Sequence, residues 1–417
     1  MITCGIDIGK DKHAVAIIDE HGKELCKPKF YNNTKADADK LIAELKKYGE
    51  LHQIQIGMES TGTYWFAYHD YLANAGCSVE VINPLITSAS IAGDVRGRKT
   101  DKQDAKKIAM VVFMGDYVHR CPEGIEARKL KALTRQRGFL MEGRTSAKLR
   151  LGSLLAEAFP EFVTAFDRPC LALLNGILSK YPTAMAMKKA RVKTLAAIID
   201  ENSRGRNGEE EAKRLIDMAK ASICADSEVA EYLAVSIRST LGVIVAFDNQ
   251  IRDVEKQIEA FEAPATAKLI MGIKGSGKVL PKVIAAEFGD IERFHHDPKT
   301  GSTKGMDKRM LAFAGCEPRI RESGKWRGTI RISKRGSGNL RAALYRIANT
   351  IRENDDYFRG VYEEKRKSKH HSVALLYVVA KFLEVICSCY KDGRNYSPVK
   401  PSHAVINSQN SVINKTH

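Results

Sequence analysis

The chain has 417 residues, enough for two or three domains, and its hydrophobic fraction of 44% is ordinary for a globular protein. Its 67 lysines and arginines outnumber its 50 acidic residues, and the net charge of +17 favours a polyanionic partner such as nucleic acid over a merely soluble basic protein. The nine cysteines form no CxxC pair, which argues against a zinc knuckle or a disulfide scaffold and for a reducing cytosol.

Neither a leader nor a membrane span is expected. Residues 2–8 already follow a strand pattern, and no signal peptide precedes them. The most apolar late stretch, residues 373–390, is interrupted by Lys381 and Glu384 and therefore predicts a buried helix. We expect a cytoplasmic protein with no membrane contact.

Residues 1–115 predict an α/β domain. A cap at Asn33 or Thr34 begins a helix that runs to about residue 48, a second helix starts near Thr63, and Thr100 caps a third helix from 101 to about 113. Five strands are expected, over residues 2–8, 13–19, 24–31, 53–59 and 78–82. Three hairpin-linked strands followed by alternating helices and strands are the order of an RNase H-like sheet.

Residues 116–264 predict a helical, coiled-coil middle region. Apolar residues recur every seven positions up to Pro264, and a weaker heptad before them is interrupted by Arg137 and Arg144. The strong heptad consists of Ile237, Ile244, Ile251 and Ile258, and the weak one of Leu133, Leu140, Ala147 and Leu154. Helices packed within one chain and a dimer-forming coil both remain open. Residues 163–226 form a helix-prone insertion without evident chemistry.

Two acidic residues lie at the ends of predicted strands. Asp7 has the opposite parity from Ile6 and Ile8, and Glu59 the opposite parity from Met58, so each carboxylate points away from its strand's aliphatic face. A glycine two residues earlier leaves space on that same face. If the two strands are neighbours, the carboxylates converge and repel each other unless a cation lies between them.

A second acidic pair begins the helix after Thr100. Asp101 and Asp104 are three residues apart and share one helix face within a strongly basic segment. Oxygen-only ligands suit Mg²⁺ or Mn²⁺, and four carboxylates can hold two ions about 4 Å apart that clamp the oxygens of a phosphoryl transfer. Alone, Asp7 could be a turn residue and Asp101 a helix cap; the set of four is far more specific.

Three segments resemble the DEDD-type transposases: residues 5–10 (GIDIGK), 58–62 (MESTG) and 99–105 (KTDKQDA). That family covers bacterial insertion-sequence recombinases and the pilin-gene inverting recombinase, and its first domain is similar to the RuvC Holliday-junction resolvase. The resemblance implies an RNase H-like (RuvC-like) domain, a catalytic and metal-binding role for Asp7, Glu59, Asp101 and Asp104, and a bacterial, nucleoid-associated protein.

Residues 265–395 no longer follow the heptad pattern and are expected to form a separate, mainly helical domain, which begins with a glycine-rich segment. Gly272 and Gly277-Lys278 have Walker spacing, but Val279 stands where Ser or Thr is needed and no strand precedes the glycines. We therefore expect a turn between two helices in which Gly275 and Lys278 contact a nucleic-acid phosphate. The remaining residues, 396–417, lack acidic side chains and predict a disordered tail.

Residues 319–341 contain eight Lys or Arg and one acid, Glu322. Ser323-Gly324 within them is consistent with a catalytic serine or with a simple β-turn in a basic loop. The region resembles the family's C-terminal transposase domain, in which the serine before the first glycine is the nucleophile; this implies a nucleophilic role for Ser323, with Ser333 as the fallback. The expected nucleic-acid contacts are Lys99, Lys102, Gly275, Lys278, Lys325, Arg327, Lys334, Arg335 and Arg341.

The sequence therefore predicts a metal-dependent recombinase whose covalent phosphoserine link allows strands to be rejoined without ATP. The resemblance further implies donor and target DNA, a guide (bridge) RNA, and a homodimer or tetramer with composite sites. Two alternatives remain: a resolvase-like nuclease that uses water, and a sugar kinase or actin-like ATPase suggested by residues 5–9. The adjacent pairs His295-His296 and His370-His371 are expected to be surface or phosphate contacts, since neighbouring rings do not readily share a metal.

Overall fold

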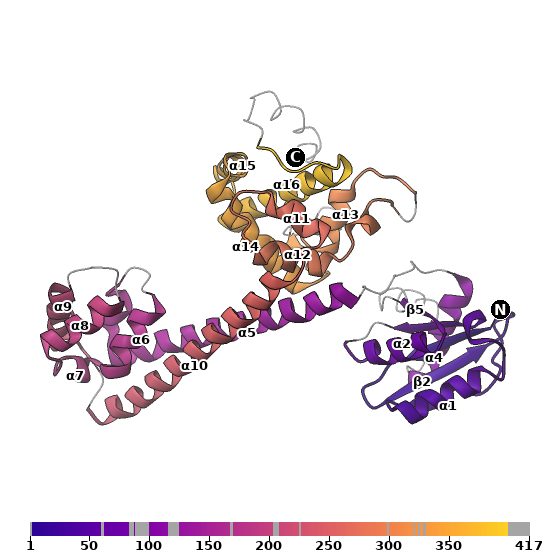
Figure 1. Cartoon of the computed structure of the whole chain (residues 1–417), viewed down its shortest axis with the longest axis horizontal. Helices are drawn as coiled ribbons and strands as arrows, with labels where there is room; N and C mark the ends of the chain where they lie inside the picture. The colour runs from indigo at the N-terminus through magenta and orange to yellow at the C-terminus, as the bar shows by residue number, and fades with distance from the viewer. Residues whose placement is uncertain are drawn as a thin grey trace. The chain divides into compact units, whose positions relative to one another are not determined.

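The computed structural model describes residues 2–59, 62–82, 87, 100–115, 125–166, 170–202, 208–224, 227–297, 300–319, 322–323, 326–327 and 331–398. The chain divides into two compact units, Met1–Gly124 and Ile125–His417. The sheet belongs to the first unit and the long helices to the second (Figure 1). The coil and the C-terminal helices lie in one unit, and the finer division at residue 265 stays a prediction.

The first unit contains a five-stranded mixed sheet in the order β3-β2-β1-β4-β5. β1, β2 and β3 are antiparallel neighbours, whereas β4 and β5 run parallel to β1. This arrangement is the expected RNase H-like fold. The strands are β1 (Thr3–Asp7), β2 (Lys12–Ile18), β3 (Lys29–Asn32), β4 (Gln55–Glu59) and β5 (Ser78–Ile82).

Helices cover both faces of this sheet. α1 (Lys35–Leu45) and α2 (Trp65–Asn74) share one apolar core with Ile6, Ile56 and their neighbours. α4 (Asp101–Met114) packs on the opposite face, where Gly5 and Gly57 lie. Glycine is needed at Gly5, because a Cβ there would come within 2.1 Å of the Ala105 carbonyl oxygen.

The third strand is shorter than predicted. The sequence suggested residues 24–31, but β3 covers Lys29–Asn32, and Glu24 makes only an isolated bridge to Ile18. Pro28 immediately precedes the strand, and proline has no N–H to donate to a ladder. The prediction was therefore wrong about where this strand begins.

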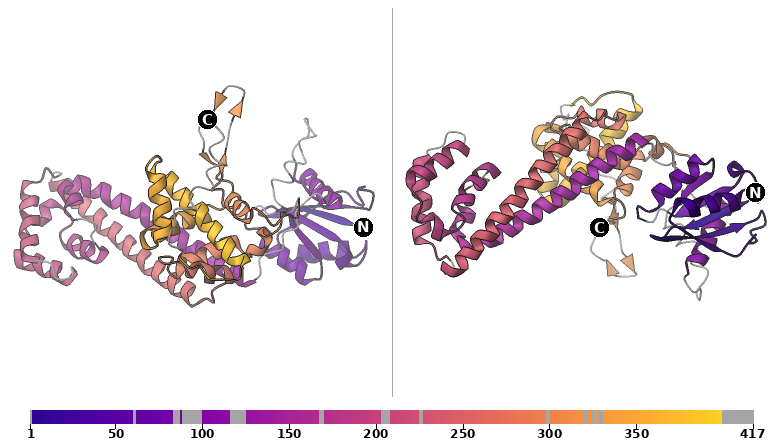
Figure 2. Two further views of the ribbon diagram at one scale, coloured as in Figure 1. Left: turned by 90° about the horizontal axis from the view of Figure 1, so that it is seen from above. Right: turned by 60° about the horizontal axis from the view of Figure 1, so that its bottom comes forward.

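The second unit is built on two long helices, α5 (Ile125–Ala158) and α10 (Ser227–Ala260), which run side by side in every view (Figure 2). The predicted heptad isoleucines of α10 are buried. The arginines that interrupt the α5 heptad pair with acids on α10, Arg137 with Glu255 at 2.6 Å and Arg144 with Asp248 at 2.5 Å. These contacts establish an antiparallel helix pair within one chain.

The residues between the long helices fold into small helices, as predicted for the insertion. They share a core with the adjoining ends of α5 and α10, in which Ile177, Leu195 and Leu215 are fully buried. The elements are η2 (Pro160–Thr164), α6 (Leu171–Lys180), α7 (Ala184–Met187), α8 (Val192–Asn202) and α9 (Gly208–Ala221).

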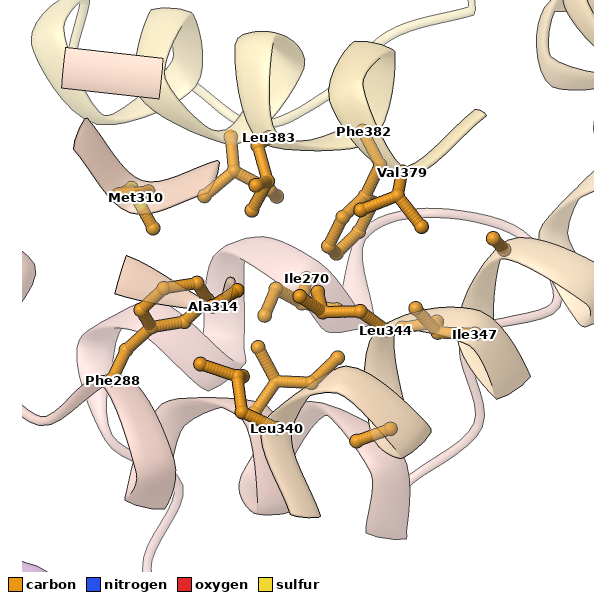
Figure 3. Packing of buried hydrophobic residues seen from close by; sticks show 14 of the residues in the cluster. Ile270, Phe288, Met310, Ala314, Leu340, Leu344, Ile347, Val379, Phe382 and Leu383 are labelled. Carbon is orange, nitrogen blue, oxygen red and sulfur yellow. The ribbon is translucent and has the colours of Figure 1, made fainter. Parts of the chain in front are cut away.

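The C-terminal helices enclose a separate core. Phe288, Leu344 and Phe382 meet there with side chains from several helices (Figure 3). The helices are α11 (Ala265–Met271), α12 (Val279–Phe288), α13 (Met306–Phe313), α14 (Gly338–Asn354), α15 (Asp356–Arg366) and α16 (His371–Lys391), with η3 (Ile291–Phe294) between α12 and α13.

Within the described residues, two helices are long and apolar enough to cross a membrane by length and composition, Glu228–Ala260 and His371–Lys391. In the second, α16, Val378, Phe382 and Leu383 belong to the C-terminal core, and Lys381 pairs with Glu384 at 2.7 Å. In the first, the buried isoleucines of α10 face α5. Both helices thus serve as core elements of this fold.

α12 is fastened to both long helices by charged side chains. Lys282 on α12 is buried, and its Nζ donates to the carbonyl oxygens of Ile258 (2.8 Å), Glu259 (2.7 Å) and Phe261 (2.5 Å) at the end of α10. Burial lowers the pKa of Lys282. Glu287, also buried, accepts a 3.0 Å hydrogen bond from Arg135 on α5. These contacts join the C-terminal helices to the coil.

Candidate active site

Asp7 and Glu59 end two neighbouring parallel strands. Ile6 pairs in register with Met58, so the two acids are the next residues at the same edge of the sheet. Gly5 and Gly57 are also register partners and both face α4, and the alternation of a strand puts Asp7 and Glu59 on that same face. Both acidic residues are partly exposed. The two strands therefore bring together the carboxylates that the sequence singled out.

The second acidic pair occupies the first turn of α4. The Thr100 hydroxyl accepts from the Gln103 N–H, as expected of a helix cap, and Asp101 and Asp104 follow it. Ala105, the next residue, packs against Ala14 and Ala16 of β2 and lies directly over Gly5. The close approach of α4 to the sheet thus places its first turn on the face that carries Asp7 and Glu59.

Two neighbouring side chains orient these carboxylates. The buried Thr87 hydroxyl donates to Oε2 of Glu59 at 2.9 Å. Lys107 Nζ lies 3.2 Å from Oδ1 of Asp104, one helical turn away. An oxygen-only donor set that is partly open to solvent fits a hard divalent cation. The sequence offered no signal for Thr87, because its contact spans 28 positions.

Ser323 lies in the second unit, within a nested pair of short hairpins. β6 (Pro318–Arg319) pairs with β9 (Arg331–Ile332), and between them β7 (Glu322–Ser323) pairs with β8 (Trp326–Arg327). Ser323 is the register partner of Trp326 at the closed end of the inner hairpin. The backbone is therefore compatible with both interpretations of Ser323, the nucleophile and the turn residue.

The base of this hairpin is tied to the end of α13. Gly315 has φ +66°, and a Cβ there would come within 2.3 Å of the Arg335 carbonyl oxygen. Lys334, with φ +55°, donates its N–H to the Gly315 carbonyl. Nη1 of Arg341 donates to the carbonyl oxygens of Ala314, Lys334 and Gly336. These contacts favour a structural role for Arg341 over the expected nucleic-acid contact.

The structure describes the surroundings of only some of the other residues that we expect to contact nucleic acid. Lys102, Lys278, Lys334 and Arg335 are exposed. Arg327 is described only as part of a strand, and Lys99 and Lys325 lie outside the described residues, as does the predicted tail beyond residue 398. Each of these assignments stays a prediction.

The glycine-rich segment is a turn between α11 and α12, as predicted, with Gly275 at φ +88° and Gly277 at φ +67°. A Cβ at Gly275 would lie 2.7 Å from the Asn354 Cβ, so packing against α14 already explains this glycine. A helix precedes the turn, whereas a Walker loop follows a strand. Gly9, the last glycine of the kinase-like motif, is explained similarly by its close approach to the Lys12 carbonyl in the β1–β2 turn.

One histidine pair has a geometry that the sequence did not suggest. Ligand atoms of Glu292, His295 and His296 all lie within 4.8 Å of one another, with Nδ1 of His295 3.4 Å from Oε1 of Glu292. The ligand atoms of this pair are close enough to share a cation, and the expectation that His295 and His296 are surface or phosphate contacts stays a prediction. Glu292 supplies the acidic neighbour three positions before His295, through the turn of η3.

The chain matches two transposase families. Residues 4–160 match a family described as "Transposase", the DEDD type of IS110 elements, and residues 267–363 match the "Transposase IS116/IS110/IS902 family". These segments contain all four candidate carboxylates and Ser323.

Insertion-element proteins are similar along most of their length. The IS116 uncharacterized 44.8 kDa protein of Streptomyces clavuligerus is 26% identical over 96% of this chain and 97% of its own length. The transposase for IS1111A of Coxiella burnetii is 24% identical over 83% of this chain and 77% of its own. Among solved structures, Thermus thermophilus RuvC aligns over 29% of this chain and all of its own, with 17% identity and a TM-score of 0.23.

Proposed function

The chain belongs to the DEDD-type insertion-sequence transposases, and on this premise we propose that it cuts and rejoins DNA by a metal-dependent phosphoryl transfer that involves Ser323. One observation carries the proposal: α4 packs on the sheet face to which Asp7 and Glu59 belong, so that its first turn adds Asp101 and Asp104 to that face.

The four carboxylates would hold Mg²⁺ or Mn²⁺. Their four negative charges balance those of two divalent ions, so we propose a pair of ions bound by Asp7, Glu59, Asp101 and Asp104. When bound, such ions stabilise the attacking and leaving oxygens of a phosphoryl transfer. The protein's own contribution is to fix the ligands: Thr87 restrains Glu59 by its hydrogen bond, and Lys107 lies beside Asp104. Both contacts limit the orientations that the two carboxylates can adopt.

Ser323 would supply the attacking oxygen. Its Oγ would bond to the scissile phosphorus while the bond from phosphorus to the leaving strand oxygen breaks, and the serine proton would pass to solvent as the leaving oxygen takes one up. The phosphoserine ester retains the energy of the broken phosphodiester, so rejoining needs no ATP. The support is the position of Ser323 within the matched transposase segment and in a hairpin rich in arginine and lysine.

A guide RNA and a composite site are part of the same proposal. The net charge of +17 is compatible with RNA as well as DNA, and the resemblance to DEDD-type transposases is the reason to expect a guide RNA that chooses targets by base pairing. Ser323 and the four carboxylates belong to separate compact units. A homodimer or tetramer would therefore allow the serine of one subunit to serve the carboxylates of another.

The test is to incubate the protein with its element's DNA ends and Mg²⁺ and then denature the mixture. We expect protein joined covalently to a DNA end, no adduct with Ser323→Ala, and no cleavage with Asp7→Ala or Asp104→Ala. Ser333→Ala should retain the adduct. Efficient cleavage by Ser323→Ala without any adduct would replace this proposal with a water-using, resolvase-like nuclease.

A further inference from the structure

A row of side chains crosses three strands beside the candidate active site. Asp7 on β1 pairs in register with Ala14 on β2, and Ala14 pairs with Phe30 on β3. Register partners face the same side of a sheet, so Phe30 lies on the α4 side together with Asp7. Because neighbouring strands are about 4.8 Å apart, the backbone of Phe30 is roughly 10 Å from that of Asp7.

Two lysines approach the Phe30 ring. Lys12 Nζ lies 4.2 Å and Lys102 Nζ 5.2 Å from the ring centroid. Lys12 begins β2, and Lys102 stands next to Asp101 in the first turn of α4. Both lysines are exposed, and the phenyl side chain is 42% exposed. Neither lysine has an acidic partner within the part of the chain that the structure describes.

Stability does not explain this arrangement. An exposed cation–π contact contributes about 0.5–1 kcal/mol, and two ammonium groups near one ring repel each other. Other lysines of this unit, such as Lys40 and Lys106, pair with Asp37 and Glu24. Two unneutralised ammonium groups on a shared apolar support are instead suited to an anion that both can contact, as a phosphodiester does.

We propose that Lys12, Phe30 and Lys102 form a phosphodiester-binding subsite that holds the DNA strand beside the carboxylates. The inference rests on the proposed function, because DNA cleavage at Asp7 requires the substrate strand to pass this point. The phenyl ring limits where the two ammonium groups can lie, and the lysines neutralise backbone charge next to the scissile phosphate. Phe30 and Lys12 were not recognised from the sequence, since the register of β2 and β3 brings them to Lys102.

DNA is the occupant that the position favours over RNA. The row leads directly to Asp7, where the strand to be cut must lie. A lysine ammonium group donates equally well to a phosphate oxygen of DNA or RNA, so the position of the row beside Asp7, and not its chemistry, is the reason to favour DNA. An RNA-binding role is therefore an alternative outcome of the test.

The test compares the full-length protein with a Lys12→Gln/Lys102→Gln variant and with Phe30→Leu. A control, Lys35→Gln/Lys46→Gln, removes two exposed lysines, one that begins α1 and one that directly follows it, and α1 covers the opposite face of the sheet. DNA affinity is measured over a range of salt concentrations, and cleavage is measured with Mg²⁺. Each lost phosphate contact lowers the slope of log K against log salt by about 0.9, so the double variant should lose roughly 1.8.

Phe30→Leu should keep the slope, because both charges remain, but it should weaken DNA binding and slow cleavage. Equal slopes for the Lys12/Lys102 and Lys35/Lys46 variants would overturn the subsite. The subsite would also be overturned if the Lys12/Lys102 variant lost affinity only for the RNA that copurifies with the protein and kept its affinity for DNA. A lysine-dependent slope in a protein that never cleaves DNA would support the subsite and contradict the proposed catalysis.

Discussion

Thr87 is not one of the four carboxylates, but its hydrogen bond restrains the orientation of Glu59, which is. The Thr87 hydroxyl donates to Glu59 Oε2, and both atoms lie close to the edge of the sheet where β1 and β4 end. A hydrogen bond to a metal-binding carboxylate fixes its orientation, and the loss of such a partner typically costs 10–100-fold in affinity or activity, which is about the effect expected here. Thr87 is therefore a positioning residue.

Thr87→Val removes this hydroxyl while it retains the branched shape. We expect the Mg²⁺ concentration needed for half-maximal cleavage to rise by roughly 10-fold or more. Thr87→Ser, which keeps the donor, should restore most of the loss. A magnesium titration of strand cleavage measures both, and identical curves for the valine and serine variants would assign Thr87 a packing role only.

His13 makes the stability of the first unit depend on pH. Its side chain is fully buried on β2, and its ring lies 4.3 Å from that of Tyr68 on α2. Burial lowers the pKa of His13 more than the nearby Asn33 side chain raises it. The unfolded chain therefore takes up a proton near pH 6.5 that the folded protein still excludes.

The free energy of unfolding should be insensitive to His13 above about pH 6.5 and should fall as the pH drops from there toward the lowered pKa. The slope contributed by this one group cannot exceed about 1.4 kcal/mol per pH unit. Urea unfolding followed by Trp65 fluorescence between pH 7.5 and 5.5 measures it. His13→Gln should have the shallower pH dependence; an equally steep decline would assign the effect to other groups.

At the scale of elements, the contact between α4 and the sheet decides whether the acidic residues meet. Gly5→Ala would place a Cβ 2.1 Å from the Ala105 carbonyl oxygen and 2.4 Å from the Ala109 nitrogen, so α4 would have to move. We expect cleavage to be lost and the unfolding free energy to fall by about 1–3 kcal/mol. Circular dichroism melts and cleavage assays measure the two effects.

Gly242 provides the matched control on α10. A Cβ at Gly242 would meet no atom within 4 Å, so Gly242→Ala should stabilise the helix by about 0.5–1 kcal/mol and leave cleavage intact. Full activity in Gly5→Ala would show that the spacing between α4 and β1 does not govern the site.

Local patterns were sufficient to predict most elements and the positions of the four acidic residues on them, because parity, capping and heptads act within a few residues; the metal site that these residues form stays a prediction. Thr100 caps α4 as expected, and Asp7 lies at the end of β1. What sequence could not supply were contacts set by register and packing. β3 begins only after Pro28. The arginines in the α5 heptad pair with acidic residues on α10, and Lys102 lies over the ring of Phe30.

For the whole molecule, the attachment of the C-terminal helices to the coil bears on how a composite site would be assembled. Lys282 holds the end of α10 and Glu287 holds Arg135 of α5, so α12 and the long helices form one body. The hairpin that carries Ser323 extends from that body between α13 and α14. An assembly that positions the coils of two subunits would therefore also position their serine hairpins.

The net charge of +17 predicts a nucleic-acid surface, and the basic residues of the serine hairpin are where we expect it on the second unit. Binding should weaken steeply as salt rises, because each phosphate contact releases counterions and adds about 0.9 to the slope of log K against log salt. Arg327→Gln, Lys334→Gln and Arg335→Gln together should lower the slope by up to roughly 2.7. Lys334 and Arg335 are exposed at the base of the serine hairpin.

The control removes the same charge from a different surface. Lys188 and Lys189 follow the end of α7, Lys193 lies on α8, and all three are exposed. Their replacement by glutamine changes the net charge by the same three units, so a nonspecific effect of charge would lower both slopes equally. A slope that falls only in the hairpin variant places the phosphates beside Ser323, where strand transfer needs them. A fall only in the control variant would instead place the main nucleic-acid surface on the helical insertion.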